Sequence, residues 1–325
     1  MTATNDITIL IAGKLHQHAV AMLEERFPTL RVERGDPALL SDEDRAKVRG
    51  MAVQTGTRAQ FIDAFPNLEI ISSFGVGYDH VDARHAGSKG VVVTNTPDVL
   101  TEEVADTAVG LLLNTVREFS RAEAWLREGK WVSTGDYPLT KGTLRERTVG
   151  IFGMGRIGQA VARRLEAFGL PISYHNRRKV EGVAYAYHPS LVELARNVDT
   201  LVSVAPGGAS TEKAVNREVL EALGPEGVFV NIGRGSTVDE EALAASLADG
   251  TIMAAGLDVF AKEPNVPEGL LKAPNAVLLP HVGSASLHTR KAMGALVADN
   301  VINWFGNGKA LTPVAETAHL NPQKG

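Results

Sequence analysis

Three charged or titratable side chains stand just beyond three successive apolar runs in the C-terminal half of the sequence. They are Arg234, Glu263 and His281, and the runs before them are residues 228–232, 252–256 and 277–279. In open α/β sheets, ligands bind beyond the carboxyl ends of the strands. If the runs are such strands, one crevice can receive all three side chains, and we predict that they are catalytic. Taken singly, they also fit a surface ion pair, a solvated acid and a turn residue.

Together these residue types suit hydride addition to a 2-oxo acid. The addition builds negative charge on the carbonyl oxygen, and a proton must arrive there. A guanidinium offers a flat fork to carboxylate and carbonyl oxygens together. An imidazolium donates protons near neutral pH, and a carboxylate beside it orients the ring and favours its charged form.

A glycine-rich turn after residues 149–152 predicts a dinucleotide site. The residues GMGRIG (153–158) match the pattern G-x-G-x-x-G, with a strand-like run before them and a helical pattern after them. Gly153 makes the turn, Gly155 lets the backbone approach a pyrophosphate, and Gly158 lets helix and strand pack together. The N–H groups of the helix start face the anion. The residues between the glycines that we predict to contact the cofactor are Met154, Arg156 and Ile157. The alternative is a tight turn in an ordinary α/β protein.

The residues after the next apolar run, 171–174, favour NADPH over NADH. An enzyme that uses NAD usually has an acid about 20 residues beyond the first glycine, where it binds the ribose hydroxyls. Here the run is followed by His175, Asn176, Arg177 and Arg178, with no acid among them. Two arginines can bind a 2′-phosphate that a carboxylate would repel. We therefore predict NADP(H) as the preferred cofactor and NAD(H) as a weaker one. The alternative is a pair of solvated arginines.

Apolar runs alternate with helical patterns, which is typical of parallel α/β sheets. In the first hundred residues the expected strands are 7–12, 51–53, 70–73 and 91–93. In the second alternation they are 149–152, 171–174, 200–204, 228–232, 252–256 and 277–279. We predict two doubly wound parallel-sheet domains, a Rossmann dinucleotide-binding domain inserted in a flavodoxin-like substrate-binding domain. The insert is residues 101–284, and the substrate-binding domain is residues 1–100 completed by 285–325.

The connecting segments carry further expectations. Residues 101–127 predict one long helix with Thr101 as its N-cap, and residues 286–305 predict another that returns to the first domain. The tail, 312–325, is polar and is expected to be loose. Residues 128–148 break all periodicity, and so long an irregular stretch is unusual without a function. We predict a homodimer through an arm at 114–148, although a flexible linker is the alternative.

Composition narrows the function classes. The chain has 325 residues, enough for two domains, with a net charge of −5 and no long basic run, so nothing indicates nucleic acid. It has no cysteine, which excludes disulfides and thiolate chemistry, and we predict no metal site. The first six residues lack a signal-peptide core, and no apolar run approaches the roughly 18 residues of a membrane span. We expect a cytoplasmic protein without a membrane partner.

The sequence resembles the D-2-hydroxyacid dehydrogenase family over nearly its full length. The matching motifs are GVGYD (75–79), EVADTA (103–108), GMGRIG (153–158), NIGRG (231–235), GLDVF (256–260) followed by Glu263-Pro264, and PHVG (280–283). The resemblance implies Arg234 as substrate anchor, His281 as acid/base and Glu263 as its partner. It also implies that the backbone N–H groups of Val76 and Gly77 hold the substrate carboxylate.

The resemblance further implies a set of cofactor contacts. Asp258 and the carbonyl of Ile232 would orient the nicotinamide carboxamide, and Thr107 would lie near the phosphates. The loop APGGAST (205–211) would line the adenosine side. The remaining residues predicted at the cofactor are Ala205, Pro206, Thr211, Gly233, Arg234, His281, Gly283 and Ser284.

Within the family, the chain looks closest to NADPH-dependent glyoxylate/hydroxypyruvate reductases. The features are NTPDVL (95–100), the two arginines and Trp131, a residue that such reductases place in the partner subunit's active site. Branches acting on 2-ketogluconate or hydroxyphenylpyruvate remain open, whereas Glu263 stands where formate dehydrogenases have glutamine. The alternatives are an NAD-dependent dehydrogenase that works oxidatively and a non-catalytic dinucleotide-sensing protein like the corepressors of this fold.

Overall fold

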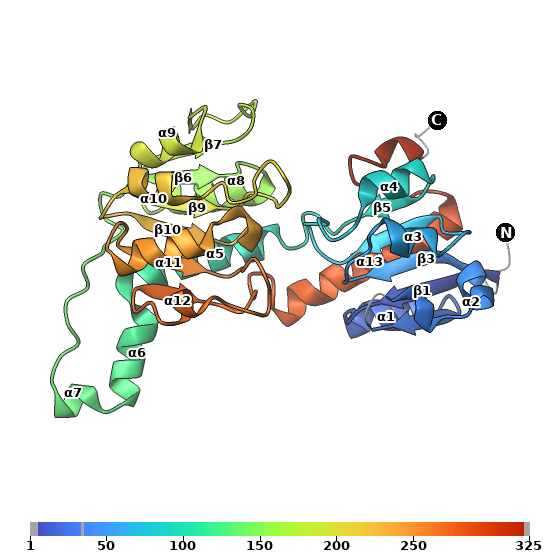
Figure 1. Ribbon diagram of the computed structural model, residues 1–325, viewed down its shortest axis with the longest axis horizontal. Helices are drawn as coiled ribbons and strands as arrows, with labels where there is room; N and C mark the ends of the chain where they lie inside the picture. The colour runs from blue at the N-terminus through green and yellow to red at the C-terminus, as the bar shows by residue number, and fades with distance from the viewer. Residues whose placement is uncertain (1–5, 34–35, 322–325) are drawn as a thin grey trace. The chain divides into compact units, whose positions relative to one another are not determined.

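The computed structural model describes residues 6–33 and 36–321, which belong to two compact units. One unit joins the residues up to Leu100 with those from Ala285 onward, and the other is Thr101–Ser284. Each unit is a parallel β-sheet with helices on its faces (Figure 1). The predicted fold class, two doubly wound parallel-sheet domains, is therefore confirmed.

The first unit has a five-stranded sheet with the order β2-β1-β3-β4-β5. This is the strand order of flavodoxin-like folds. Its strands are β1 (Thr8–Ala12), β2 (Thr29–Val32), β3 (Val48–Val53), β4 (Ile70–Ser73) and β5 (Val92–Thr94). Its α-helices are α1 (Gln17–Glu24), α2 (Asp42–Lys47), α3 (Ala59–Asp63), α4 (Ala83–Ser88) and α13 (Leu287–Asn307). The strand β2 was not predicted, because its four residues carry little apolar signal and lie at the sheet edge.

The side chains of neighbouring residues in one strand pack on opposite faces of this sheet. Ile71 packs in the same cluster as Phe61 and Ile62 of α3, whereas Ile70 packs with Trp304 and Phe305 of α13. Both faces are therefore covered, which explains why the strands read as continuous apolar runs and not as alternating ones. The helix α13 starts where the sequence predicts it.

The tail is ordered where the structure describes it, so the expectation of a loose segment was wrong for residues 312–321. Val314 and Thr317 are buried, and Pro313 forms an antiparallel bridge with Thr94. The Val93 N–H donates to the Thr317 hydroxyl at 3.0 Å. The tail thus satisfies backbone groups on the outer side of the edge strand β5, a requirement that its polar composition does not reveal. Residues 322–325 lie outside the described residues.

The second unit has a seven-stranded parallel sheet with the order β12-β11-β10-β9-β6-β7-β8. Its strands are β6 (Val149–Phe152), β7 (Ile172–His175), β8 (Ala186–Tyr187), β9 (Thr200–Ser203), β10 (Val228–Asn231), β11 (Ala254–Leu257) and β12 (Ala276–Leu278). The chain reverses its direction of travel across the sheet between β6 and β9, which creates the switch point where doubly wound sheets bind ligands. Six strands were predicted; β8, with two residues, is too short to leave a pattern.

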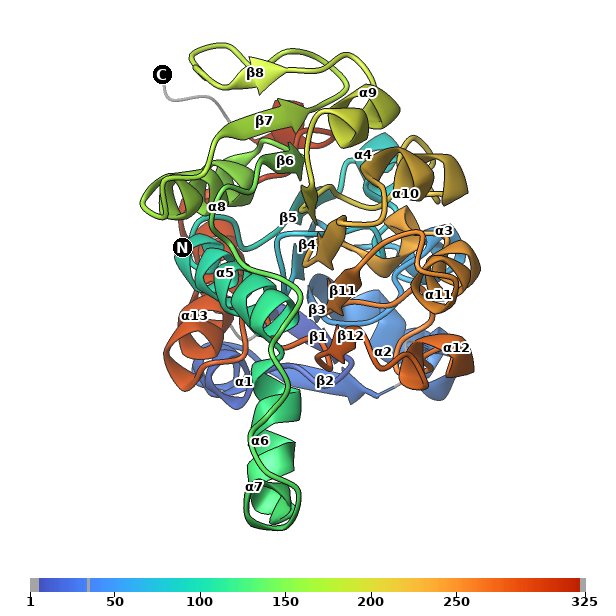
Figure 2. The same cartoon turned by 90° about the vertical axis from the view of Figure 1, so that its left-hand side faces the viewer.

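The second unit has α-helices on both faces of this sheet and others that extend away from it (Figure 2). They are α5 (Thr101–Arg117), α6 (Phe119–Arg127), α7 (Lys130–Ser133), α8 (Arg156–Glu166), α9 (Leu191–Arg196), α10 (Arg217–Leu223), α11 (Glu240–Ala248) and α12 (Glu268–Leu271). The amphipathic helix α8 buries Ala160, Val161 and Leu165.

The single long helix predicted for 101–127 is two helices, so that prediction was wrong. It breaks at Glu118, whose φ of 52° is left-handed. The Asn114 side chain accepts the Ser120 N–H at 2.9 Å and so satisfies a donor at the new helix start. One residue in a left-handed conformation does not disturb the helical periodicity, so the sequence pattern hides the break. The helix also begins at Thr101 itself, which is therefore not its N-cap.

The helices α6 and α7 run away from the sheet of their unit (Figure 1 and Figure 2). No residue of either helix is buried. We call residues 114–148 the arm, as in the sequence analysis. Within it only α7 interrupts the irregular stretch that was expected at 128–148.

We predict that Thr317→Val destabilises the first unit, because it leaves the buried Val93 N–H without its acceptor. Such a loss costs about 1–3 kcal/mol. The free energy of unfolding from urea titration checks this, with Thr29→Val as control, because the Thr29 hydroxyl makes only an exposed 3.5 Å bond. Equal stabilities of the two variants would contradict the role given to Thr317.

Candidate active site

The loop between β6 and α8 requires glycine at two positions for reasons of space. Gly153 has a φ of +104°, and a Cβ there would lie 2.8 Å from the Ala205 backbone nitrogen. A Cβ on Gly158 would overlap the carbonyl oxygen of Gly153. Gly155 differs, because apart from its chain neighbours no atom of the described residues lies within 4 Å of the position its Cβ would take. The loop is therefore tightly packed on its protein side and can be approached at Gly155.

Gly155 is also the N-cap of α8, the helix that follows the loop. The first N–H groups of a helix have no intrahelical acceptor, and the helix dipole favours an anion there. No acidic residue stands in the first turn of α8 to repel one. These residues fit the pyrophosphate of a dinucleotide, and they lie at the switch point of the sheet.

The predicted cofactor residues after β7 divide into two roles. The Asn176 side chain accepts the Met154 N–H at 2.6 Å, so it braces the glycine-rich loop. Arg177 and Arg178 are exposed, and neither makes a hydrogen bond or ion pair with the residues that the structure describes. No carboxylate occupies positions 175–180. The end of β7 therefore presents two uncommitted cations, which fit a 2′-phosphate.

Arg234, Glu263 and His281 follow β10, β11 and β12, which are neighbours in the sheet. The structure joins two of them directly, because His281 Nδ1 and Glu263 Oε2 are 2.7 Å apart. Arg234 is held by a 2.8 Å bond from its Nη1 to the Gly233 carbonyl, and its charge acts on Glu263. The sheet thus gathers the predicted trio at one edge.

The ionisation of Glu263 follows from its contacts. Burial alone would raise the pKa of Glu263, but the hydrogen bonds from His281 and from the Phe260 N–H lower it. The charges of His281 and Arg234 act in the same direction, so the pKa of Glu263 lies below its usual value. Glu263 is therefore a carboxylate near neutral pH. It accepts from Nδ1 and leaves Nε2 of the ring for a substrate.

Asp258 has a structural function that sequence reasoning missed. Its two carboxylate oxygens accept the N–H groups of Val282 and Gly283 at 2.7 and 2.8 Å. Its carbonyl accepts the His281 N–H at 2.8 Å. His281 has a left-handed φ of 54°, so these bonds hold a backbone conformation that histidine rarely adopts. Burial raises the pKa of Asp258, and the two N–H groups oppose that rise. The predicted contact with the carboxamide stays a prediction.

The loop that carries Arg234 is locked by residues that were not predicted individually. The Asn231 amide and the Thr237 hydroxyl both donate to the Arg234 carbonyl, at 2.9 and 2.7 Å. A Cβ on Gly235 would overlap the backbone of Phe260. This close approach ties the Arg234 loop to the loop of Glu263. Asn231 and Gly235 stand inside the NIGRG motif, so the sequence did contain a signal for them.

Glu240, at the start of α11, holds the other side of the Glu263 loop. Its carboxylate accepts the Ala261 N–H at 2.8 Å. Burial raises the pKa of Glu240, and the nearby charge of Glu263 adds to that rise. Nothing in its sequence context distinguishes this acid from a solvated one at a helix start.

The other predicted cofactor residues lie around the same edge. The Thr107 hydroxyl lies 3.0 Å from the Glu103 carbonyl and 3.1 Å from that of Gly283, so it links α5 to the His281 loop. Thr211 closes its own loop by donating to the Pro206 carbonyl at 2.7 Å. The predicted cofactor residues that are buried are Met154, Gly158, Ala205, Ile232, Gly233, Asp258, Gly283 and Ser284.

Val76 and Gly77 belong to the first unit, in the loop that follows β4. The Val76 carbonyl accepts the Asn95 side chain at 2.8 Å, and the Gly75 N–H donates to the Thr96 hydroxyl at 3.0 Å. The loop is half-buried. It is therefore fixed by the residues that leave the neighbouring strand β5.

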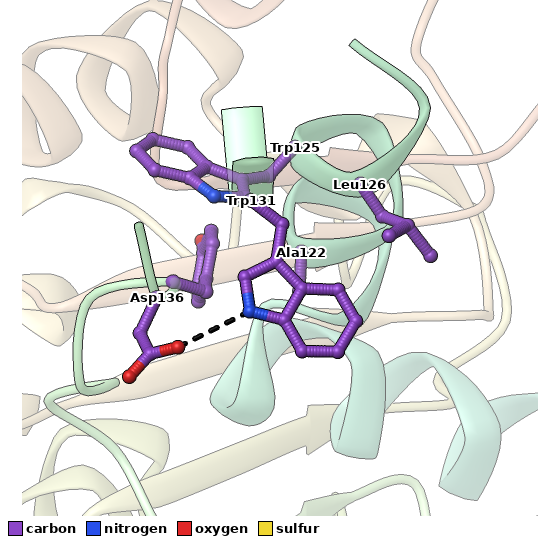
Figure 3. Close-up of a pocket in the computed structure, with 6 residues that line it drawn as sticks. Ala122, Trp125, Leu126, Trp131 and Asp136 are labelled. Carbon is purple, nitrogen blue, oxygen red and sulfur yellow. Dashed lines mark hydrogen bonds between the residues drawn. The ribbon is translucent and has the colours of Figure 1, made fainter. Parts of the chain in front are cut away.

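The arm carries a hollow lined by aromatic and apolar side chains (Figure 3). Its lining residues are Ala122, Trp125, Leu126, Trp131, Asp136 and Tyr137. The Trp131 Nε1 donates to Asp136 at 3.1 Å (Figure 3), and the Trp125 Nε1 donates to the Gly135 carbonyl at 3.1 Å. These bonds fold the end of the arm back on α6. The Trp131 side chain remains 59% exposed.

Two kinds of feature are missing from residues 6–33 and 36–321. No group of three His, Cys, Asp or Glu side chains there could hold a metal ion. No helix in these ranges has both the length and the apolar character needed to cross a bilayer.

Comparison with known proteins finds a family model over residues 109–283, described as the NAD binding domain of D-isomer specific 2-hydroxyacid dehydrogenases. Hydroxyphenylpyruvate reductase from Plectranthus scutellarioides is 46% identical, with 95% of this chain and 99% of that protein covered. A glyoxylate/hydroxypyruvate reductase from Arabidopsis thaliana is 44% identical over the same shares.

A solved structure shares the whole fold. It is an NADPH-dependent glyoxylate/hydroxypyruvate reductase from Sinorhizobium meliloti in complex with NADP and malonate. It is 57% identical with a TM-score of 0.95, and 99% of this chain and 100% of that chain are covered. By its family model and by relatives that match along nearly its whole length, this chain belongs to the D-isomer specific 2-hydroxyacid dehydrogenase family.

Proposed function

We propose that this protein reduces a small 2-oxo acid, such as glyoxylate or hydroxypyruvate, to the D-2-hydroxy acid. NADPH is the preferred hydride donor, and NADH is a weaker one. The observation that carries the proposal is the His281–Glu263 pair beside Arg234, at the sheet edge where the glycine-rich loop can bind a dinucleotide. The names of the relatives support it, because each of those proteins is called a reductase of a 2-oxo acid.

When bound, NADPH supplies a hydride to the carbonyl carbon. His281 then protonates the carbonyl oxygen from Nε2, because Nδ1 is bonded to Glu263. Arg234 offers its guanidinium to the carbonyl and carboxylate oxygens and so balances the growing negative charge. The N–H groups of Val76 and Gly77 bind the carboxylate. These roles are proposals that rest on the geometry of each unit and on the family resemblance.

The cofactor is proposed to bind along the carboxyl edge of the second unit. Gly155 and the start of α8 bind the pyrophosphate, and Arg177 with Arg178 binds the 2′-phosphate. Asp258 and the Ile232 carbonyl orient the carboxamide. The proposed domain roles follow: residues 101–284 bind the dinucleotide, and residues 1–100 with 285–325 bind the substrate.

A homodimer through the arm belongs to the same proposal. Val132 is 95% exposed and Leu139 is 98% exposed, although both are apolar. They share the arm with the aromatic hollow around Trp131, and exposed apolar side chains gathered in one segment are typical of an interface. A second copy of the chain is the proposed partner, and Trp131 is proposed to reach its active site.

We predict that His281→Ala lowers kcat by about 10²–10⁴-fold, the usual contribution of general acid catalysis, while the Kd for NADPH barely moves. The measurement is NADPH oxidation with a panel of 2-oxo acids, and His319→Ala is the control. If the wild type reduces none of these acids, the proposed function is contradicted and a dinucleotide sensor is favoured. Near-normal turnover in His281→Ala would remove only His281 from the mechanism.

We predict that Glu263→Gln moves the alkaline limit of reduction to lower pH. The variant removes the negative charge that lies 2.7 Å from Nδ1, and with it the attraction between that charge and an imidazolium. The hydrogen bond and charge of His281 help to hold the pKa of Glu263 below its usual value. In the wild type, the interaction between the Glu263 carboxylate and His281 is present at every pH above the lowered pKa of Glu263. It is lost only as the pH falls through that pKa. The pH profile of kcat/KM tests this, with Glu218→Gln as control. If the alkaline limit of the pH profile does not move, Glu263 is not coupled to His281.

We predict that Arg177→Ala/Arg178→Ala loses the preference for NADPH. Hydrogen bonds to charged groups contribute about 1.5–3 kcal/mol each, so NADPH affinity should fall on the order of tenfold to several hundredfold. NADH has no 2′-phosphate, and its affinity should change little. The measurement is the ratio of kcat/KM for NADPH to kcat/KM for NADH. The control is Arg26→Ala/Arg84→Ala, which removes the same charge from the other unit. An unchanged ratio would show that these arginines do not read the phosphate.

We predict that the wild type sediments as a dimer and that Val132→Asp/Leu139→Asp shifts it to monomer, because charges would have to be buried in the interface. Sedimentation velocity at matched concentrations tests this. Leu39→Asp, at an exposed leucine outside the arm, should leave the dimer intact. A stable, active wild-type monomer would overturn the proposed dimer.

A further inference from the structure

The loop at 75–77 presents two backbone donors with nothing to bind. In the ranges that the structure describes, neither the Val76 N–H nor the Gly77 N–H makes a hydrogen bond, although the loop is half-buried. Backbone donors removed from water normally have a partner. Two adjacent free N–H groups are therefore suited to an anionic oxygen.

The direction of one of these donors is set by a side chain. The Asn95 Nδ2 donates to the Val76 carbonyl at 2.8 Å. The peptide bond between Val76 and Gly77 is planar and trans, so its N–H points opposite to its carbonyl. By holding the carbonyl, Asn95 turns the Gly77 N–H away from itself.

Asn95 is itself held by a buried network. The Thr312 hydroxyl donates to the Asn95 carbonyl at 2.6 Å, and the Asn95 N–H donates to the Thr312 carbonyl at 3.3 Å. The fully buried Asn300 of α13 donates to the Thr312 hydroxyl at 2.9 Å. The backbone of Asn95 is therefore held in place, and its side-chain amide can orient the loop.

The adjacent peptide is held just as firmly. The Gly75 N–H donates to the Thr96 hydroxyl, and the Thr96 N–H donates to the Gly75 carbonyl, at 3.0 and 2.9 Å. Thr96 is fully buried. With this side of the loop fixed, the Val76–Gly77 peptide is the part that a lost Asn95 bond would release.

We propose that Asn95 is a positioning residue for the substrate: it aims the Gly77 N–H at the carboxylate of the 2-oxo acid. This inference rests on the proposed function. The carboxylate is present in both the substrate and the transition state, so contacts to it stabilise both equally, which is called uniform binding. Loss of uniform binding raises KM and leaves kcat nearly unchanged.

The test compares a 2-oxo acid with its methyl ester, which has the same carbonyl but no carboxylate. In Asn95→Asp the side chain is nearly isosteric but has lost the donor to the Val76 carbonyl. Its KM for the acid should rise roughly tenfold to a hundredfold, because a hydrogen bond to a charged group is lost. The KM for the ester, kcat and the Kd for NADPH should stay near wild type, so the preference for acid over ester falls.

Two further variants separate positioning from folding. Asn303→Asp is the matched control, because the half-buried Asn303 also donates to a backbone carbonyl, that of Lys309, at 2.7 Å. Asn95→Ala removes the donor without adding charge, and the preference should fall in it as well. If wild type is active but both Asn95 variants keep the acid-over-ester preference, or lose acid and ester equally, the inference is overturned. If wild type reduces no 2-oxo acid, the proposed function fails and the inference fails with it.

Discussion

The candidate active-site edge of the second unit depends on the buried carboxylate of Asp258. Taking an ionised carboxylate out of water is costly unless its oxygens are bonded, and here the Val282 and Gly283 N–H groups bond both. In return, the carboxylate holds the two residues that follow His281, and His281 itself has a left-handed φ. The position of the imidazole therefore depends on Asp258, a residue in a different loop. A charge-assisted network of this kind fixes one conformation, because every alternative leaves a buried charge without partners.

The parallel sheet explains why three distant segments can act together. All parallel strands end at the same edge, so β10, β11 and β12 deliver Arg234, Glu263 and His281 side by side. The loops are then tied to one another by contacts of the main chain, such as the close approach of Gly235 to Phe260. Side chains carry the proposed chemistry, but backbone packing sets its geometry.

The strand order also separates the two ends of the proposed cofactor site. The arginines follow β7, and Arg234 follows β10, three strands away in the sheet. At about 4.8 Å per strand, this is roughly 14 Å along the edge. The glycine-rich loop after β6 lies between them. In the proposed binding mode the 2′-phosphate lies at one end of this edge and the nicotinamide at the other, so cofactor preference and catalysis could vary independently.

The sequence by itself determined the fold class, the family and most of the residues at the candidate site. Buried strands such as β4 and β10 read as apolar runs, and the GMGRIG loop requires glycine for reasons of local space. These are signals within a few residues of each other, and a sequence displays them directly. The roles proposed for the site residues remain predictions.

Only the tertiary structure decided the rest. The break at Glu118 takes one left-handed residue, and the edge strand β8 has two residues, so neither leaves a periodic signal. Thr317 looks like any polar tail residue until β5 presents an unpaired N–H to it. Asp258 and Glu240 look alike as acids, yet their partners lie 24 and 21 residues away along the chain. What a polar side chain does depends on which backbone groups the fold leaves without partners, and that is settled only when distant segments pack together.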